Sequence, residues 1–292
     1  MQDVAIIGSG PAGLSAALYT VRAGLSTAVY VGETRGGLPT TTELVDNYLG
    51  LPGIEGVEMA EVFLNHAKKL GVPLYNDIVE SIFSKDDGTF SVILTNGNSY
   101  DFRSVIFAAG SKPRKLGIPG EDLPGVSWCA TCDGSFSSGE DTAVVGGGES
   151  AVEEAIYMSN IANKVTVLVR GDSFRATQPA VDLLVSKPNV EVLYNVSVEE
   201  VIGDGGVESI RLSSGASLPV YSLFEAIGQI PQSALANRHS ALYDNGFISH
   251  SSVPGFFVAG DISNPEYRQI AVAVGDGAKA GMDAIKFIQL ES

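Results

Sequence analysis

Residues that bind metal ions or nucleic acids are scarce in this sequence. It contains 2 cysteines and 3 histidines in 292 residues, and the histidines stand apart at His66, His239 and His250. A zinc site usually needs four ligands close together, so we expect no metal site. The chain has 18 lysines and arginines and 34 aspartates and glutamates, which gives a net charge of -16. A surface of that sign repels nucleic acids and anionic membranes, so we expect neither as a partner.

Long apolar runs are also missing. No run approaches the ~18 residues that cross a bilayer, and the chain enters a predicted strand at Val4–Ile7 without a basic leader. We therefore expect a cytoplasmic protein, and in that compartment cysteines are more often reactive than structural. The 45% hydrophobic content and 34 glycines are typical of an α/β protein with tight turns, and 292 residues give room for about two domains.

The two cysteines lie close together, in the stretch Cys129-Ala130-Thr131-Cys132-Asp133-Gly134. In a helical turn, positions i and i+3 are neighbours, which brings the sulfurs within reach of a ~2 Å disulfide bond. A helix N-terminus at this point would lower the pKa of the thiols and favour the reactive thiolate. Asp133 is a candidate proton carrier, because reducing a disulfide to two thiols consumes protons. The pattern predicts a redox site whose catalytic residues are Cys129, Cys132 and Asp133.

A glycine-rich turn follows the first predicted strand. Val4–Ile7 leads into Gly8-Ser9-Gly10-Pro11-Ala12-Gly13, and Leu14–Ala23 reads as a helix. This is the setting in which G-x-G-x-x-G binds a dinucleotide: the glycines let the backbone approach the pyrophosphate, and the helix N-terminus offers free N–H groups. Glu33 follows the next predicted strand, Thr27–Val31, and is either a ribose ligand or a surface turn residue.

A second glycine-rich turn repeats this arrangement 14 residues after Cys132. Gly146-Gly147-Gly148-Glu149-Ser150-Ala151 stands between two predicted strands, the second being Lys164–Val169. At the end of that strand a 2′-phosphate favours arginines and a bare ribose favours a carboxylate. The sequence supplies Arg170 and Arg175 with Asp172 between them, which favours NADPH and leaves NADH open.

The C-terminal part of the chain returns to a similar pattern. Phe256–Asp261 predicts a buried strand that ends in Gly260-Asp261, and a helix is expected from about 271 to 290. Asp261 could accept a hydrogen bond from a ribityl hydroxyl or cap the helix. The small residues Gly36-Gly37-Leu38 could let the backbone approach a flat ring. Between these segments Glu58–Leu70 predicts an amphipathic helix, with Met59, Val62, Phe63 and Leu70 on its apolar face.

The order of these motifs resembles the low-molecular-weight thioredoxin reductases over nearly the whole chain. The shared stretches include CATCDG at 129–134, Ala226-Ile227-Gly228, Gly260-Asp261 and Arg268-Gln269. The resemblance implies an α/β fold of two dinucleotide-binding, Rossmann-like three-layer domains, the second inserted in the first. Residues 1–111 and 245–292 would then form the FAD-binding domain. Residues 112–244 would form the inserted pyridine-nucleotide-binding domain that carries the cysteines.

The resemblance also implies a function. It is that of a homodimeric, FAD-dependent thioredoxin-disulfide reductase, in which Cys132 faces the flavin, Cys129 attacks thioredoxin and Asp133 serves as acid and base. One disulfide cannot touch a buried flavin and a protein substrate at once. The inserted domain must therefore rotate, with hinges expected near Lys112–Arg114 and Asp244–Gly246.

The motifs and the resemblance together give two sets of candidate cofactor ligands. The FAD set is Gly8, Ser9, Gly10, Pro11, Ala12, Gly13, Glu33, Gly37, Asn47, Val79, Gly110, Gly260, Asp261, Arg268, Gln269 and Ile270. The pyridine-nucleotide set is Gly146, Gly148, Glu149, Ser150, Ala151, Arg170, Arg175 and Gly228.

The electron donor is less clearly indicated than the flavin. The family's NADPH loop usually reads His-Arg-Arg-x-x-x-Arg, and here Val169 and Gly171 replace the histidine and one arginine. Each lost charge-assisted contact to a phosphate costs about 1.5–3 kcal/mol, so we expect weak use of NADPH. NADH, a deazaflavin or ferredoxin are other donors, and Lys112, Arg114 and Lys115 are the only tight basic cluster for an acidic ferredoxin. A flavin-dependent oxidase of small dithiols and a non-catalytic flavin-binding module are alternative functions.

Overall fold

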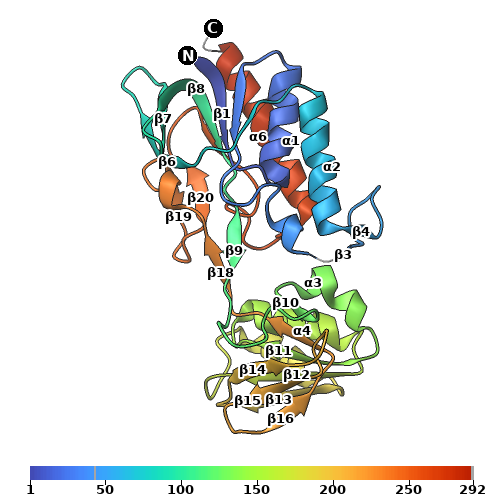
Figure 1. The fold of residues 1–292 in the computed structure, drawn as a ribbon. Coiled ribbons are helices and arrows are strands. Elements are labelled where there is room, and N and C mark those ends of the chain that lie inside the picture. The colour runs from blue at the N-terminus through green and yellow to red at the C-terminus, as the bar shows by residue number, and fades with distance from the viewer. Residues whose placement is uncertain (43, 291–292) are drawn as a thin grey trace. The chain divides into compact units, whose positions relative to one another are not determined.

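Short β-branched runs of the sequence become parallel strands at the centre of two units (Figure 1). The computed structural model describes residues 1–42 and 44–290. Unit 1 combines Met1–Lys112 with the segment that begins at Ile230, and unit 2 is Pro113–Gln229. The chain crosses between them in β9 (Ser111–Pro113) and β18 (Gln229–Pro231), which are neighbours in a two-stranded sheet.

The return to unit 1 occurs earlier than the sequence indicates. Unit 1 resumes at Ile230, so the expected boundary at 245 and the expected hinge segment Asp244–Gly246 lie inside unit 1 rather than at its edge. Asn245 and Gly246 instead form the turn between β19 (Ser240–Leu242) and β20 (Ile248–Ser251), an antiparallel pair inside unit 1. Gly246 has φ +85°, which explains why a glycine stands at this turn.

Unit 1 is built on a seven-stranded sheet. Its order is β5 (Leu74–Tyr75), β2 (Thr27–Tyr30), β1 (Gln2–Ile7), β8 (Ser99–Phe107), β7 (Phe90–Leu94) and β6 (Val79–Ser84), with β21 (Phe256–Val258) also paired to β8. Strands β1, β2, β5, β8 and β21 are parallel to one another. Ile7 is level with Tyr30 and with Phe107, so three strands end together where the first glycine-rich turn begins.

Three helices cover one face of this sheet: α1 (Pro11–Arg22), α2 (Gly56–Lys69) and α6 (Ile270–Leu290) (Figure 1). Helices α1 and α6 approach closely because small residues line their contact. A Cβ on Gly277 would lie 2.0 Å from the carbonyl oxygen of Ala12. Ser15 Oγ also donates a hydrogen bond of 2.7 Å to the carbonyl of Val274. The C-terminal helix therefore holds the helix that follows the first glycine-rich turn.

Helix α2 lies where the sequence predicts it, but its buried face is different. Met59 is buried as expected, whereas Val62 and Leu70 are 40% and 37% exposed. Leu64 and two alanines of α2 complete the buried face instead. The sequence pattern considered only large apolar side chains. The buried alanines lie on a different side of the helix, so the predicted apolar face was misplaced.

Unit 2 has three layers. Its central parallel sheet has the order β10 (Val126–Ser127), β17 (Ser222–Glu225), β11 (Asp141–Val145), β12 (Lys164–Val169) and β13 (Val190–Tyr194). Helices α4 (Glu149–Ser159) and α5 (Gln178–Val185) pack on one face. The antiparallel strands β14 (Val198–Ile202), β15 (Ser209–Leu212) and β16 (Ser217–Pro219) pack on the other face. These observations and the parallel sheet of unit 1 confirm the predicted α/β, Rossmann-like fold class.

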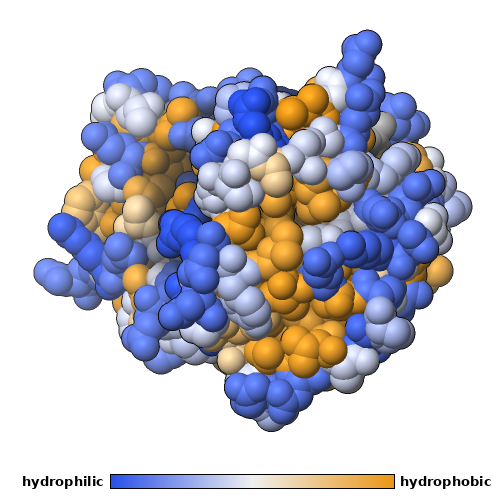
Figure 2. All heavy atoms as spheres, turned by 90° about the horizontal axis from the view of Figure 1, so that it is seen from below, coloured by the Kyte–Doolittle hydropathy of each residue, from blue (hydrophilic) through white to orange (hydrophobic). Residues whose placement is uncertain are grey.

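The surface is mixed in character. Figure 2 shows one face, on which hydrophobic residues lie among hydrophilic ones. In unit 2, Leu183 and Val185 of α5 are 50% and 53% exposed, and scattered exposed side chains of this kind are normal for folded proteins. Among the helices of residues 1–42 and 44–290, none is long and apolar enough to cross a membrane.

Candidate redox centre and nucleotide cradles

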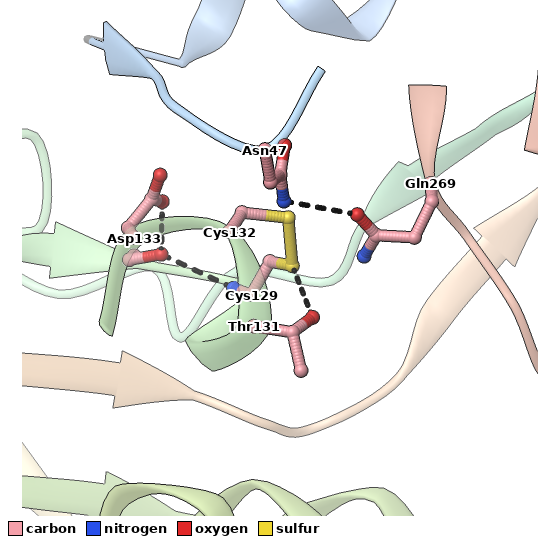
Figure 3. Close-up of a disulfide and its surroundings, with 7 residues drawn as sticks. Asn47, Cys129, Thr131, Cys132, Asp133 and Gln269 are labelled. Carbon is pink, nitrogen blue, oxygen red and sulfur yellow. Dashed lines mark hydrogen bonds between the residues drawn. A yellow bond between two sulfur atoms is a disulfide. The ribbon is translucent and has the colours of Figure 1, made fainter. Parts of the chain in front are cut away.

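The two cysteines share one helical turn in unit 2. A disulfide joins Cys129 to Cys132, whose Cα atoms are 5.3 Å apart (Figure 3). Cys129 caps the four-residue helix α3 (Ala130–Asp133), and its carbonyl accepts hydrogen bonds of 3.1 Å from the N–H groups of Cys132 and Asp133. The predicted i, i+3 neighbourhood of the sulfurs is confirmed. Cys129 Sγ also lies 3.4 Å from the hydroxyl of Thr131.

Asp133 is held by a serine that sequence reasoning missed. Ser127, the last residue of β10, donates a hydrogen bond of 2.5 Å from Oγ to Oδ2 of Asp133. The same Oγ accepts a hydrogen bond of 3.1 Å from the N–H of Cys129. Ser127 is only 6% exposed, so a buried hydroxyl links the carboxylate beside Cys132 to the backbone of Cys129.

A second missed residue, Glu225, holds the tryptophan that precedes Cys129. Trp128 Nε1 donates a hydrogen bond of 2.9 Å to Oε2 of Glu225, and the N–H of Leu116 donates one of 3.2 Å to the same oxygen. Glu225 is 2% exposed, and burial raises the pKa of its carboxyl. Lys115 Nζ lies 4.9 Å from the centre of the Trp128 ring. The sequence signal was a glutamate at the end of a buried strand.

Gly134 completes the redox turn by allowing it to pack on α4. A Cβ at this position would lie 2.7 Å from Sδ of Met158 and 3.2 Å from Cε1 of Tyr157. Ala130, on the same turn, is fully buried in the core of unit 2. The turn is therefore seated on a fixed element rather than on a loose loop.

The glycine-rich turn at Gly8–Gly13 is called the first cradle below, and its glycines have different structural roles. Gly8 has φ +110°, and a Cβ there would lie 2.4 Å from the carbonyl oxygen of Ala108. A Cβ on Gly13 would lie 2.0 Å from the carbonyl oxygen of Gly8, so α1 packs directly on the turn. Among the described residues, a Cβ on Gly10 would have only Gly37 within 4 Å. The Gly10 backbone is left accessible at the N-terminus of α1, where a pyrophosphate is bound in folds of this kind.

The second cradle in unit 2 repeats this division. Gly146 has φ +149°, and a Cβ there would lie 2.4 Å from the carbonyl oxygen of Ala226 and 2.7 Å from Cβ of Ala151. Gly148 precedes α4, and no atom of residues 1–42 and 44–290 lies within 4 Å of its Cβ position. The open glycine again stands at a helix N-terminus, the arrangement that suits a dinucleotide phosphate.

The loop after β12 is tied to this second cradle. Glu149 accepts hydrogen bonds of 2.8 Å and 2.9 Å from the backbone N–H and the hydroxyl of Thr177. The N–H of Arg175 donates one of 2.6 Å to the carbonyl of Gly147. Arg170 and Arg175 are exposed, and neither has an ion pair within the described ranges. Two arginines are thus available beside the cradle, while the Glu149 side chain is engaged by the loop.

Comparison with known proteins decides the family. The family model described as pyridine nucleotide-disulphide oxidoreductase matches residues 2–277. A thioredoxin reductase from Listeria innocua is 38% identical, with 98% of this chain and 94% of the relative covered, and one from Bacillus subtilis is 37% identical with 98% and 95% covered. The chain belongs to the thioredoxin reductase family. The crystal structure of thioredoxin reductase from Streptococcus pyogenes MGAS5005 has a TM-score of 0.94 and 36% identity, with 99% of each chain covered.

The thioredoxin reductase family is a family of FAD-binding oxidoreductases, and unit 1 has the features that an FAD site needs. The bend at Gly260 packs against α1, because a Cβ there would lie 2.8 Å from Cβ of Ala12. The next residue, Asp261, is partly buried, and burial raises the pKa of its carboxyl to about 6, opposed by the charge of Arg268. A half-buried carboxyl beside an open phosphate cradle fits a ribityl hydroxyl. Helix α6 begins only at Ile270, so Asp261 does not cap it, and that alternative is wrong.

Other residues of the predicted FAD set are distributed unevenly. Asn47 and Gln269 are brought together, with Nδ2 of Asn47 donating a hydrogen bond of 3.2 Å to Oε1 of Gln269 (Figure 3). Ser9 is buried; its hydroxyl donates to the carbonyl of Val31 and accepts from the N–H of Gly36, so it fixes the loop around Gly37. The Val79 side chain lies in the core, which leaves only its backbone for a ligand.

Charged residues near the first crossing are already paired. Glu33, the expected ribose ligand, accepts a hydrogen bond of 2.5 Å from Nζ of Lys112. Lys115 forms an ion pair of 2.7 Å with Asp122 and lies 3.9 Å from Glu121. Two of the three residues expected to form a basic ferredoxin-binding cluster are therefore paired with carboxylates.

Proposed function

We propose that the chain is a thioredoxin-disulfide reductase that uses bound FAD and the Cys129–Cys132 pair. The observation that carries this proposal is the Cys129–Cys132 disulfide within a single turn. Asp133, next to Cys132, accepts a hydrogen bond from Ser127. The relatives named thioredoxin reductase support the choice of thioredoxin as the substrate. Bound FAD, once reduced by an electron donor, would supply the two electrons that open the disulfide.

The side chains then carry out two exchanges. The Cys129 thiolate attacks one sulfur of the thioredoxin disulfide, which forms a mixed disulfide and releases a thiolate on thioredoxin. The Cys132 thiolate attacks Cys129 Sγ, which restores the Cys129–Cys132 disulfide and releases the second thioredoxin thiolate. Asp133 holds the proton that a thiolate leaving group needs, and takes one up when the thiols ionise.

The second cradle is the proposed site of a pyridine nucleotide. Gly146, Gly148 and the N-terminus of α4 would hold the phosphates, with Ser150 and Ala151 in the same motif and Gly228 in the segment between β17 and β18. Arg170 and Arg175 would face a 2′-phosphate. The histidine and one arginine of the family pattern are replaced here by Val169 and Gly171. We therefore propose weak NADPH use, and titration with NADPH and NADH while flavin bleaching is recorded tests it; micromolar, NADPH-selective bleaching would contradict it.

Homodimerisation and a cytoplasmic location belong to the same proposal. The homodimer is what the family resemblance implies, and the location is the one expected from the sequence. Size-exclusion chromatography with light scattering tests the first, and cell fractionation tests the second.

Anaerobic photoreduction of the FAD-loaded protein provides the decisive experiment. Addition of oxidised thioredoxin is expected to reoxidise the flavin rapidly, and Cys132→Ser is expected to abolish this response while FAD stays bound. Thr131→Ser, which keeps the hydroxyl near Cys129 Sγ, is the matched control. A flavin that ignores thioredoxin but forms peroxide with small dithiols would identify a dithiol oxidase. A flavin unresponsive to any thiol would identify a non-catalytic module, and protein that binds no FAD would overturn the proposal.

A further inference from the structure

The hydroxyl of Ser127 stands between the two ends of the redox turn. It donates to Oδ2 of Asp133 at 2.5 Å and accepts from the N–H of Cys129 at 3.1 Å. Ser127 is 6% exposed and belongs to β10, where it is level with Phe224 of β17 in a parallel ladder. The hydroxyl is therefore anchored in the sheet, whereas the carboxylate that it contacts lies at the end of the short helix α3.

A hydroxyl at this place can serve both protonation states of Asp133. It has one hydrogen and two lone pairs. The Cys129 N–H occupies one lone pair, and the hydrogen goes to Asp133 while that group is a carboxylate. When Asp133 carries a proton, the second lone pair of Oγ can accept it and the hydroxyl rotates. A single hydroxyl can therefore keep the carboxyl group oriented both before and after it gains a proton.

We propose that Ser127 is a positioning residue that aims the Asp133 carboxyl at the dithiol throughout the reaction. This inference rests on the proposed acid and base role of Asp133. It assigns Ser127 no contact with the substrate or with FAD; the serine acts only through the carboxyl. The same Oγ accepts a hydrogen bond from the Cys129 N–H, so one atom holds both the Asp133 carboxyl and the backbone at the start of the redox turn.

A double-mutant cycle separates this role from simple closure of the turn. The variants are Ser127→Ala, Asp133→Asn and both together, made in the FAD-loaded full chain. Thioredoxin reduction by the prereduced enzyme is followed in a single turnover. Ser127→Ala is expected to slow the reaction roughly tenfold or more, the scale of a lost hydrogen bond to a charged group. In the Asp133→Asn background the same change is expected to alter the rate less than about twofold, because coupled residues are not additive.

Two further variants control for folding. Ser137 is also buried in unit 2 and donates a hydrogen bond of 2.8 Å from Oγ to Oγ of Ser222, without contact to Asp133. Ser137→Ala is therefore the matched loss of a buried hydroxyl, and it is expected to keep the wild-type rate. Ser127→Thr retains the hydroxyl and is expected to recover most of the rate. FAD content and melting temperature are measured for every variant.

The outcomes are distinguishable. Equal effects of Ser127→Ala in both backgrounds would overturn the inference while leaving Asp133 as the acid and base. A wild-type rate for Ser127→Ala, or failure of Ser127→Thr to recover the rate with normal FAD content, would do the same. A wild-type rate for Asp133→Asn would overturn the proposed role of Asp133 and this inference together. Loss of thioredoxin reduction in the unmodified protein would instead refute the proposed function.

Discussion

Replacement of Trp128 by Phe tests the buried contact behind the redox turn. Phe keeps an aromatic ring but lacks the Nε1–H that donates to Glu225 at 2.9 Å. Glu225 Oε1 is buried with no hydrogen-bond partner within the described residues, so Oε2 would retain only the Leu116 N–H. A hydrogen bond to a charged group contributes about 1.5–3 kcal/mol, and we expect the free energy of unfolding to fall by about 2 kcal/mol at pH 8.

The loss should depend on pH with a defined sign. Burial raises the pKa of Glu225, so its neutral form is favoured in the folded state, and stability is lost as the pH rises through that pKa. Removing the Trp128 donor makes the carboxylate still less favourable. The difference between Trp128→Phe and the wild type is therefore expected to be largest at pH 8 and to shrink as the pH falls and Glu225 is protonated.

Urea unfolding followed by far-UV circular dichroism measures this difference. Fluorescence is unsuitable because Trp128 is the only tryptophan. The control is Glu225→Gln, which keeps an oxygen acceptor without the charge; in that background Trp128→Phe is expected to cost only about 0.5–1.5 kcal/mol. An equal loss at pH 4 and pH 8, or an equal loss in both backgrounds, would refute the reasoning.

Three more substitutions test other parts of the structure. Gly134→Ala should cost about 1–3 kcal/mol of unfolding free energy, because the new Cβ overpacks the contact with α4; an unchanged urea midpoint would contradict this. Gly277→Ala places a Cβ 2.0 Å from the carbonyl oxygen of Ala12, so purified protein should contain much less FAD, whereas Gly275→Ala, with nothing within 4 Å, should contain a normal amount. In FAD-free protein, burial raises the pKa of Asp261 to about 6. Its contribution to stability is complete below about pH 4 and is lost as the pH rises through 6, about 2 kcal/mol after allowance for partial exposure; Asp261→Asn should flatten this dependence, and a parallel pH profile would count against it.

Local patterns predicted the parts of the site that depend on neighbours in sequence. Both glycine-rich turns stand between a strand and a helix, as expected. Gly8 and Gly146 are needed there because a Cβ on either would collide with the carbonyl oxygen of Ala108 or Ala226. The disulfide follows from the spacing of Cys129 and Cys132 alone. In each case the determining contacts lie within one strand–turn–helix unit.

Contacts between distant segments were not accessible in the same way. Glu225 meets Trp128 because β10 pairs with β17, and 97 residues separate the two side chains. Ser127 is near Asp133 in sequence, but only the fold shows that its hydroxyl points to the carboxylate and not to solvent. The sequence prediction placed the return to unit 1 at Asn245-Gly246, because this dipeptide is typical of both linkers and hairpin turns. In the structure it forms a hairpin turn inside unit 1.

The pairing of α1 with α6 has a consequence for how the protein is made. Helix α1 ends at Arg22 and its partner begins at Ile270, so at roughly 5–20 residues per second the ribosome needs on the order of 10–50 s to supply the partner. During that time all of unit 2 emerges as one continuous segment and can complete its own core. The first half of unit 1 must wait during this time with the α6-facing side of α1 uncovered, so this apolar surface is exposed until the last residues are made.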